Sequence, residues 1–295
     1  MEVTFLGTSA MVPTRNRNHP GVLLTYGGEN ILIDCGENIQ RQLRIGGVSP
    51  AKITKLLVSH WHGDHVLGIP GLIQSLSASD YQRTLEIYGP ERSKNFMKKI
   101  VSAFLLKGKI DFVVNEVKGK FFENEDFVLE AYLMKHTVPC LAFSFIEKDK
   151  RRVNVGYVKK FGLERHPLLG ELQKGKDIFY NGKKIKAKDA TIIKKGRKVT
   201  YITDTEFIAG CIKVAKDADL LVCEATYSKE LEEKAREYQH LTAEQAAEIA
   251  KKAGVKKLVL THFSQRYKSV GKLEKEAKEV FKNTFISKDF MKVNV

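Results

Sequence analysis

The stretch Ser59-His60-Trp61-His62-Gly63-Asp64-His65 places four side chains that bind divalent metals within six residues. It directly follows an apolar, β-branched run at residues 53–58, which is typical of a buried strand. In open α/β sheets, functional sites form at the carboxyl ends of strands. His60 and His62 project to one side of an extended chain, whereas Asp64 and His65 follow a glycine and can turn toward a second position. The spacing predicts two adjacent metals; the alternative is a surface loop that carries its histidines by chance.

Composition indicates a globular protein without a membrane segment. Hydrophobic residues make up 43% of the 295 residues, and no apolar run approaches the roughly 20 residues that a membrane span needs. The chain begins as a strand, without the basic stretch and cleavage site of a signal peptide. Its four cysteines (Cys35, Cys140, Cys211 and Cys223) form no C-x-x-C pair and no disulfide-dense pattern. We therefore expect a cytoplasmic protein.

The net charge of +15 is concentrated in one segment. Residues 150–198 contain 16 Lys and Arg against 4 Asp and Glu, a net of +12, and the rest of the chain carries only +3. A localised basic block favours a polyanion-binding site, although a solvated lysine-rich insertion would look the same. The block separates predicted strands at 141–147 and 199–203. We therefore predict a single domain, residues 1–295, with residues 150–198 as an inserted arm projecting from it.

Strands and helices alternate through the rest of the chain, which predicts an α/β fold. Further strands are predicted at 3–8, 22–26, 30–35, 85–88, 110–117, 127–134, 220–226 and 258–261, and helices at 38–45, 92–106, 230–238 and 243–253. Thr242 and Gln245 make a capping box for the last helix.

Potential ligands and acids stand at the ends of five of these strands: Asp34, His60, His136, Asp204 and His262. Convergence at one sheet edge explains them together. Asp34 is costly to bury without a partner; it either orients a metal-bound histidine or caps the helix at 38–45.

These residues resemble a known signature. His60-x-His62-x-Asp64-His65, followed by His136, Asp204 and His262, is similar to the motif of the metallo-β-lactamase superfamily. More narrowly, the chain resembles the short form of tRNase Z, from Phe5-Leu6-Gly7-Thr8 to the stretch around Arg266-Tyr267. Three loops resemble those of that family: Pro13-x-Arg15-x-Arg17-Asn18, Glu224-Ala225-Thr226 and His240-Leu241-Thr242. Leu241 departs from the usual serine, and His166-Pro167 stands where a Gly-Pro pair is expected.

The resemblance implies an αββα sandwich of two mixed sheets and two zinc ions per subunit, other divalent metals being possible. It assigns His60, His62 and His136 to one metal, and Asp64, His65 and His262 to the other, with Asp204 bridging. Asp64 is then also the general base. His240, oriented by Glu224, is the candidate acid for the leaving oxygen; the alternative is a structural histidine before the following helix. Arg15, Arg17, Asn18 and Thr242 become candidate substrate contacts.

The function implied is a cytoplasmic endoribonuclease that removes the 3′ trailer from precursor tRNA. It would cut after the discriminator, leaving a 3′-hydroxyl on the tRNA and a 5′-phosphate on the trailer. The resemblance further implies a homodimer, with no membrane partner and no nucleotide cofactor. A hydrolase of small thioesters or lactams would need no basic arm. A β-CASP nuclease would need a large insertion between Asp204 and His262, where only 57 residues lie. A non-enzymatic RNA-binding protein would not need the full ligand set.

Overall fold

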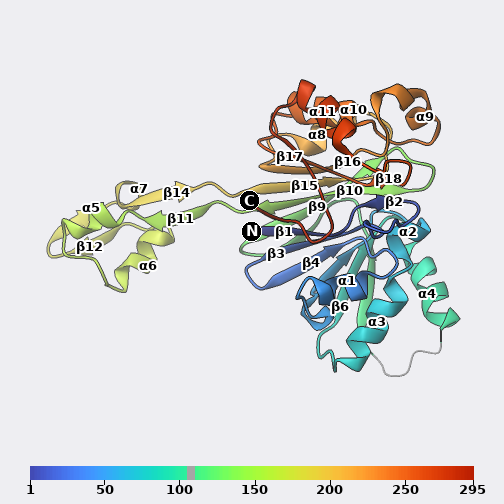
Figure 1. The fold of residues 1–295 in the computed structure, drawn as a ribbon. Helices are drawn as coiled ribbons and strands as arrows, with labels where there is room; N and C mark the ends of the chain where they lie inside the picture. The colour runs from blue at the N-terminus through green and yellow to red at the C-terminus, as the bar shows by residue number, and fades with distance from the viewer. Residues whose placement is uncertain (105–109) are drawn as a thin grey trace. The chain divides into compact units, whose positions relative to one another are not determined.

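Two seven-stranded sheets lie face to face in the first of two structural units (Figure 1). The computed structural model describes residues 1–104 and 110–295. The first unit comprises residues 1–122, 129–145 and 198–295. Its first sheet has the order β20 (Lys292–Asn294), β1 (Glu2–Gly7), β3 (Gly21–Tyr26), β4 (Glu29–Ile33), β5 (Lys55–Leu57), β6 (Leu85–Gly89) and β7 (Phe112–Glu116). The second has the order β19 (Thr284–Ile286), β17 (Leu258–Thr261), β16 (Leu220–Glu224), β15 (Lys198–Ile202), β10 (Cys140–Glu147), β9 (Phe127–Met134) and β8 (Gly119–Glu123).

Parallel pairing brings the strand ends that carry the predicted ligands to one edge. In the first sheet β4, β5 and β6 are parallel neighbours. In the second sheet β15, β16 and β17 are parallel, with Ile202 opposite Cys223 and Glu224 opposite Thr261. The loops after β15 and β17 therefore start at the same level, which is where Asp204 and His262 lie.

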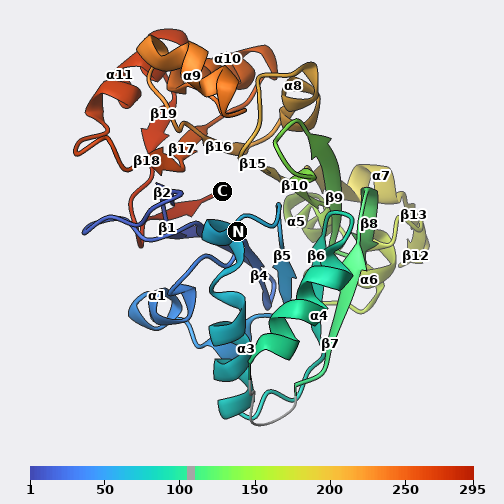
Figure 2. The same ribbon diagram turned by 90° about the vertical axis from the view of Figure 1, so that its right-hand side faces the viewer.

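Helices cover the outer face of each sheet (Figure 2). The first sheet is covered by α1 (Ile39–Ile45), α3 (Ile69–Ala78) and α4 (Ser93–Ala103). The second is covered by α8 (Ala209–Ala215), α9 (Glu232–Glu237), α10 (Ala243–Lys252) and α11 (Gly271–Val280). Between the sheets, Leu57 of the first and Phe143 of the second line the same small void, and the rings of Tyr26 and Phe145 meet edge to face at 5.2 Å. The predicted αββα sandwich is confirmed.

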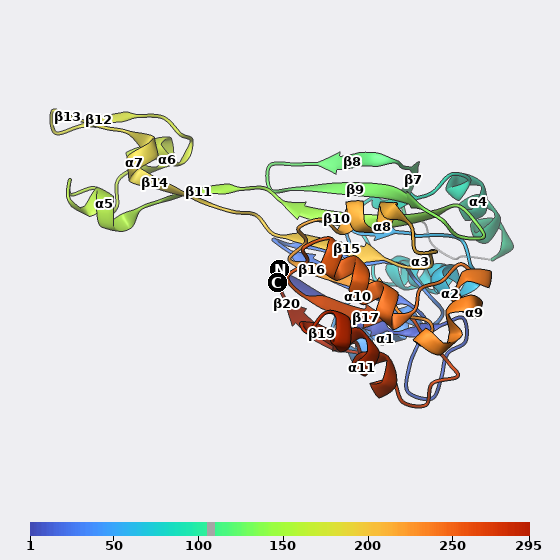
Figure 3. The ribbon, with the colours of Figure 1, turned by 90° about the horizontal axis from the view of Figure 1, so that it is seen from above.

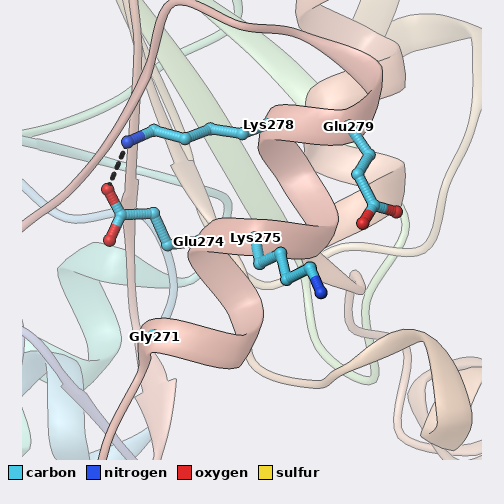
Figure 4. Close-up of a pocket in the computed structure, with 5 residues that line it drawn as sticks. All are labelled: Gly271, Glu274, Lys275, Lys278 and Glu279. Carbon is cyan, nitrogen blue, oxygen red and sulfur yellow. Dashed lines mark hydrogen bonds and ion pairs between the residues drawn. The ribbon is translucent and has the colours of Figure 1, made fainter.

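Local signals explain most element boundaries. The Thr242 hydroxyl accepts a hydrogen bond from the Gln245 amide and the Gln245 side chain accepts one from the Thr242 amide, so the predicted capping box starts α10. The helix predicted over 92–106 is α4, and its expected last two residues lie outside the described residues. In the two large sheets and the longer helices that cover them, the prediction missed α8, α11, β8, β19 and β20. α11 buries only Leu273 and Ala277, and its exposed face is charged, with Glu274 and Lys278 paired at 2.6 Å (Figure 4).

The second unit comprises residues 123–128 and 146–197. It contains a ribbon of β11 (Lys150–Val153) and β14 (Thr191–Lys194), the hairpin of β12 (Ile178–Tyr180) and β13 (Lys183–Ile185), and three short helices (Figure 3). These helices are α5 (Val155–Lys159), α6 (Leu168–Gln173) and α7 (Ala187–Ala190). Leu163, Leu172, Ile178 and Ile185 are buried in its small core, whereas Phe179 is 72% exposed. Most of this unit coincides with the basic segment, while residues 123–128 were not foreseen as part of it.

Among the described residues, no helix is long and apolar enough to cross a membrane. All four cysteines are buried and unpaired.

Candidate metal centre

Loops and one short helix at the shared edge of the sheets carry the predicted ligands. His60 and His62 lie between β5 and α2 (Gly63–Val66), and α2 itself carries Asp64 and His65. The turn of α2 separates the second pair from the first, which is the change of direction predicted at Gly63. His136 follows β9, Asp204 follows β15 and His262 follows β17. All seven residues belong to the first unit.

The first set of ligands comprises His60, His62, His136 and Asp204. His62 Nδ1 lies 3.1 Å from His60 Nε2 and 3.2 Å from His136 Nε2. One carboxylate oxygen of Asp204, Oδ2, lies 3.6 Å from His60 Nε2 and 3.8 Å from His136 Nε2. Four donors bound tetrahedrally to zinc at about 2.1 Å would be about 3.4 Å apart, so these spacings suit one such ion.

The second set comprises Asp64, His65 and His262. The Nε2 atoms of the two histidines are 3.2 Å apart, and Asp64 Oδ2 lies 3.4 Å from that of His65 and 3.6 Å from that of His262. The other oxygen of Asp204, Oδ1, lies 3.5 Å from His65 Nε2 and 3.2 Å from His262 Nε2. The two oxygens of Asp204 therefore face different sets, as a bridging carboxylate requires.

Whether a cation fits these donor sets can be judged from the histidine ring nitrogens that point away from them. His65 Nδ1 lies 2.9 Å from Asp34 Oδ2, and His136 Nδ1 lies 3.1 Å from the carbonyl oxygen of Gln239. A carboxylate or carbonyl only accepts, so each of these nitrogens donates, and the Nε2 of each neutral ring turns a lone pair inward. Inward lone pairs only 3.2 Å from another ring nitrogen repel unless a cation or proton lies between them. The donors thus suit metal ions.

Asp34 is fully buried behind His65. Besides His65 Nδ1, its Oδ2 accepts from Ser59 Oγ at 2.8 Å and from the Tyr201 hydroxyl at 3.0 Å, and its Oδ1 accepts from the Ser59 amide at 2.7 Å. The N-cap residue of α1 is Asn38 instead. Of the two interpretations of Asp34, the structure places it against the histidine and not at the helix cap.

His240 lies beside both sets and is bound to Glu224. Its Nδ1 lies 3.1 Å from Glu224 Oε2, so this nitrogen donates and Nε2 is left for another partner. Burial disfavours the charged imidazole, but the Glu224 and Asp204 carboxylates outweigh this effect and raise the pKa of His240 to about 9. His240 is also near enough to Asp204 and His262 to be considered a ligand, but Glu224 occupies its Nδ1.

The predicted substrate contacts differ in what they already bind. Arg15 is exposed. Arg17 Nη2 donates to the carbonyl oxygens of Tyr267 at 2.8 Å and Ser264 at 3.3 Å. The side-chain Nδ2 of Asn18 donates to the carbonyl oxygen of Glu37 at 2.9 Å. Thr242 is buried and caps α10. These three side chains shape the loops around the site.

Two residues at the centre were missed in the sequence. Thr226 Oγ1 lies 2.5 Å from Glu224 Oε2 and 3.0 Å from His262 Nδ1. It therefore links Glu224, the partner of His240, to the candidate ligand His262. Tyr201 was read only as a strand residue, yet its hydroxyl reaches Asp34. The Glu224-Ala225-Thr226 loop contained a signal for the first; the second depends on a contact across 167 residues of sequence.

Backbone strain marks the same edge. Asp34, Asp204 and His262 have φ values of 59°, 31° and 59°, in the left-handed region that non-glycine residues seldom adopt. Such conformations cost about 1–3 kcal/mol each and cluster at functional sites. Three strands are therefore followed within two residues by a strained residue: two of these, Asp204 and His262, belong to the donor sets, and Asp34 holds His65 from behind.

Comparison with known proteins decides the family. A ribonuclease Z of Methanothermobacter thermautotrophicus is 40% identical over 297 residues, covering 100% of this chain and 97% of that protein. The chain belongs to the ribonuclease Z family. A ribonuclease Z of Lactococcus lactis subsp. lactis is also 40% identical, over 98% of each chain.

Family models and a solved structure agree with membership of the ribonuclease Z family. The beta-lactamase superfamily domain matches residues 190–263, and the model described as anti-Pycsar protein Apyc1 matches residues 1–123. The crystal structure of the short form of human tRNase Z (ELAC1) superposes with a TM-score of 0.73 at 28% identity, covering 100% of this chain and 99% of that one. The resemblance seen in the sequence is confirmed.

Proposed function

We propose that this chain is a zinc-dependent endoribonuclease that removes the 3′ trailer from precursor tRNA, cutting after the discriminator. Its ribonuclease Z relatives and the solved short-form tRNase Z support that substrate. The observation that carries the proposal is the pair of donor sets joined by Asp204, with the acid pair of His240 and Glu224 beside them. Hydrolysis of a phosphodiester needs charge stabilisation, a base and an acid, and this edge of the sandwich offers all three.

Two zinc ions suit the donor sets. His60, His62 and His136 would hold one, and Asp64, His65 and His262 the other, with one oxygen of Asp204 toward each. Imidazole-rich sets with carboxylates favour zinc, although other divalent metals accept the same donors. Bound zinc supplies Lewis-acid stabilisation of phosphoryl charge and lowers the pKa of water toward neutrality.

Two side chains of the protein handle the protons of the reaction. Asp64 Oδ2 accepts a hydrogen bond from the Met11 amide at 2.8 Å, which fixes the carboxylate beside His65 and His262, where it can orient and deprotonate the attacking water. His240, held by Glu224, gives its Nε2 proton to the leaving 3′-oxygen as the P–O3′ bond breaks. The tRNA then ends in a 3′-hydroxyl, and the phosphate stays on the trailer.

Substrate binding divides between the two units. In the first, Arg15 is the exposed cation of the loop before β3 and contacts a phosphate, whereas Arg17, Asn18 and Thr242 hold their loops in shape. In the second, the basic segment 150–198, with its net charge of +12, grips the tRNA by backbone and shape. We further propose that the segment is an inserted arm of one domain, that two copies form a homodimer and that the enzyme is cytoplasmic.

The decisive experiment incubates the purified protein with a trailer-bearing tRNA and maps the cut, with zinc content measured on the same sample. We expect cleavage directly after the discriminator, a 5′-phosphate on the trailer, and loss of activity with a chelator that zinc reverses. An intact substrate in the presence of tightly bound tRNA would favour the non-enzymatic RNA-binding alternative.

A further inference from the structure

A cavity of about 370 Å³ opens beside His240. The loop after β9 contributes Lys135, the loop after β15 contributes Glu206 and Phe207, and α9 contributes Arg236. Lys135 directly precedes the ligand His136, and Glu206 and Phe207 stand two and three residues after Asp204. The Glu206 amide donates to the Lys135 carbonyl oxygen at 2.9 Å, so the two loops are tied together. The cavity wall is thus built on the same loops as the centre.

The lining of this cavity suits one nucleotide better than a run of phosphates. The ring of Phe207 is only partly buried, with Lys252 Nζ over it at 5.2 Å from the centroid, and the part of the ring that lines the cavity gives a base a surface on which to stack. Arg236 is exposed and can pair with a phosphate. An acid offsets the charge of the other lysine or arginine in the lining, because Lys135 Nζ lies 2.7 Å from Glu206 Oε2. A second acid of the lining, Glu232, accepts a hydrogen bond from the Gln245 side chain at 3.2 Å. These carboxylates are acceptors for ribose hydroxyls or base amino groups. The volume lies within the ordinary range of small-ligand pockets.

The position of the cavity tells which nucleotide it takes. His240 lines it, whereas Asp64 does not. Asp64 accepts the backbone amide of Met11, whose carbonyl oxygen lies 3.2 Å from His19 Nε2. His19 lines a different cavity, together with Pro13 and Asn18. In an in-line displacement the attacking and leaving oxygens stand on opposite sides of phosphorus. The nucleoside that carries the leaving 3′-oxygen must therefore lie on the His240 side.

We propose that the cavity beside His240 binds the last nucleotide retained on the product, the one 5′ of the cleaved bond, with its base stacked on Phe207 and a phosphate on Arg236. This rests on the proposed function, because it assigns the His240 side to the leaving group. It fixes the polarity of the bound RNA: the body of the product extends from this cavity, and the trailer leaves past the Pro13 and His19 end.

The test is a double-mutant cycle between Phe207 and the bases on either side of the cut. Three precursor tRNAs are compared: one intact, one abasic at the last retained nucleotide and one abasic at the first trailer nucleotide. F207A should lower kcat/KM for the intact precursor and for the trailer-abasic one by roughly five- to a hundred-fold, mainly through KM. On the precursor that lacks the retained base, F207A should cost less than twofold. The Kd of the mature tRNA should rise by the same factor as KM.

Two controls keep the result interpretable. F207W keeps an aromatic surface and should behave as wild type, and F285A removes an exposed aromatic from the edge strand β19 and should change none of the ratios. If F207A fails to fold, the comparison of F207L with F207W on the same substrates decides. Equal losses on all three precursors, or coupling to the trailer base, would overturn the assignment. A wild-type protein that cuts no trailer-bearing tRNA would instead refute the proposed function.

Discussion

Replacing Asp34 by asparagine would remove the charge behind His65 while keeping the size of the side chain. Asp34 is fully buried and accepts four hydrogen bonds, three at Oδ2 and one at Oδ1. An amide has only one accepting atom. If its oxygen takes the Oδ2 position, its NH2 group faces the Ser59 amide, and that buried donor loses its partner. The perturbation therefore acts on folding and on the orientation of His65 together.

The magnitude follows from these bonds. Leaving the Ser59 amide unpaired costs about 1–3 kcal/mol, and changing three bonds from a charged to a neutral acceptor costs up to about 1 kcal/mol each. The free energy of unfolding of the metal-free protein should fall by about 1–6 kcal/mol. At about 2 °C per kcal/mol for a chain of this size, Tm should fall by about 2–12 °C. Zinc affinity should fall about 10–100-fold, the usual effect of losing a partner that orients a ligand.

Two measurements separate these effects: thermal unfolding of the metal-free protein, and zinc affinity in competition with a chromophoric chelator. Tyr201→Phe is the matched control, because it removes one donor from Asp34 and leaves the contact with His65 intact. It should lower Tm by about 2 °C and leave zinc affinity unchanged. If D34N bound zinc as tightly as Y201F, the carboxylate would be needed for folding alone, and our reasoning about His65 would be refuted.

Three further predictions address the reaction itself. D64A should abolish cleavage of trailer-bearing tRNA while its Kd for that tRNA, measured by filter binding, stays within about twofold; lost affinity would count against Asp64 as the base. Deleting residues 152–195, which hold 12 Lys and Arg against 4 acids, should raise the Kd for tRNA at least about tenfold and spare hydrolysis of bis(p-nitrophenyl) phosphate. Loss of both activities would give the segment a structural role. H240A should lower kcat on tRNA by about 10²–10⁴-fold but hardly affect bis(p-nitrophenyl) phosphate, whose leaving group needs no proton; equal losses would exclude His240 as the acid.

Sequence periodicity was sufficient to predict the strands whose carboxyl ends carry the residues of the metal centre. β5, β9, β15, β16 and β17 are short, mostly apolar runs. Each ends in, or is followed within three residues by, an ionisable side chain of the centre, which would be costly to bury there without a functional partner. α11 was missed for the opposite reason. Two buried side chains in ten residues, among lysines and glutamates, leave too weak a stripe to distinguish a helix from a charged loop.

The roles of polar loop residues were harder to predict because they depend on contacts across the fold. Arg17 reads as a phosphate ligand, yet its guanidinium donates to carbonyl oxygens about 250 residues further along the chain. Conversely, Tyr201 reads as a core residue and turns out to hold Asp34. A motif specifies the types of donor atom in a site. The hydrogen-bond partners of Arg17 and Tyr201, by contrast, are brought together only by the folding of distant parts of the chain.

That packing has a consequence for the metals themselves. His60, His62, Asp64 and His65 come from the first sheet, and His136, Asp204 and His262 come from the second. Each donor set therefore takes ligands from both sheets, and neither is complete on one alone. Because the unfolded chain does not hold these donors together, the free energy of metal binding adds to the stability of the packed sandwich. The ions proposed for the chemistry would then also hold the two sheets together at the edge where the strained residues Asp34, Asp204 and His262 lie.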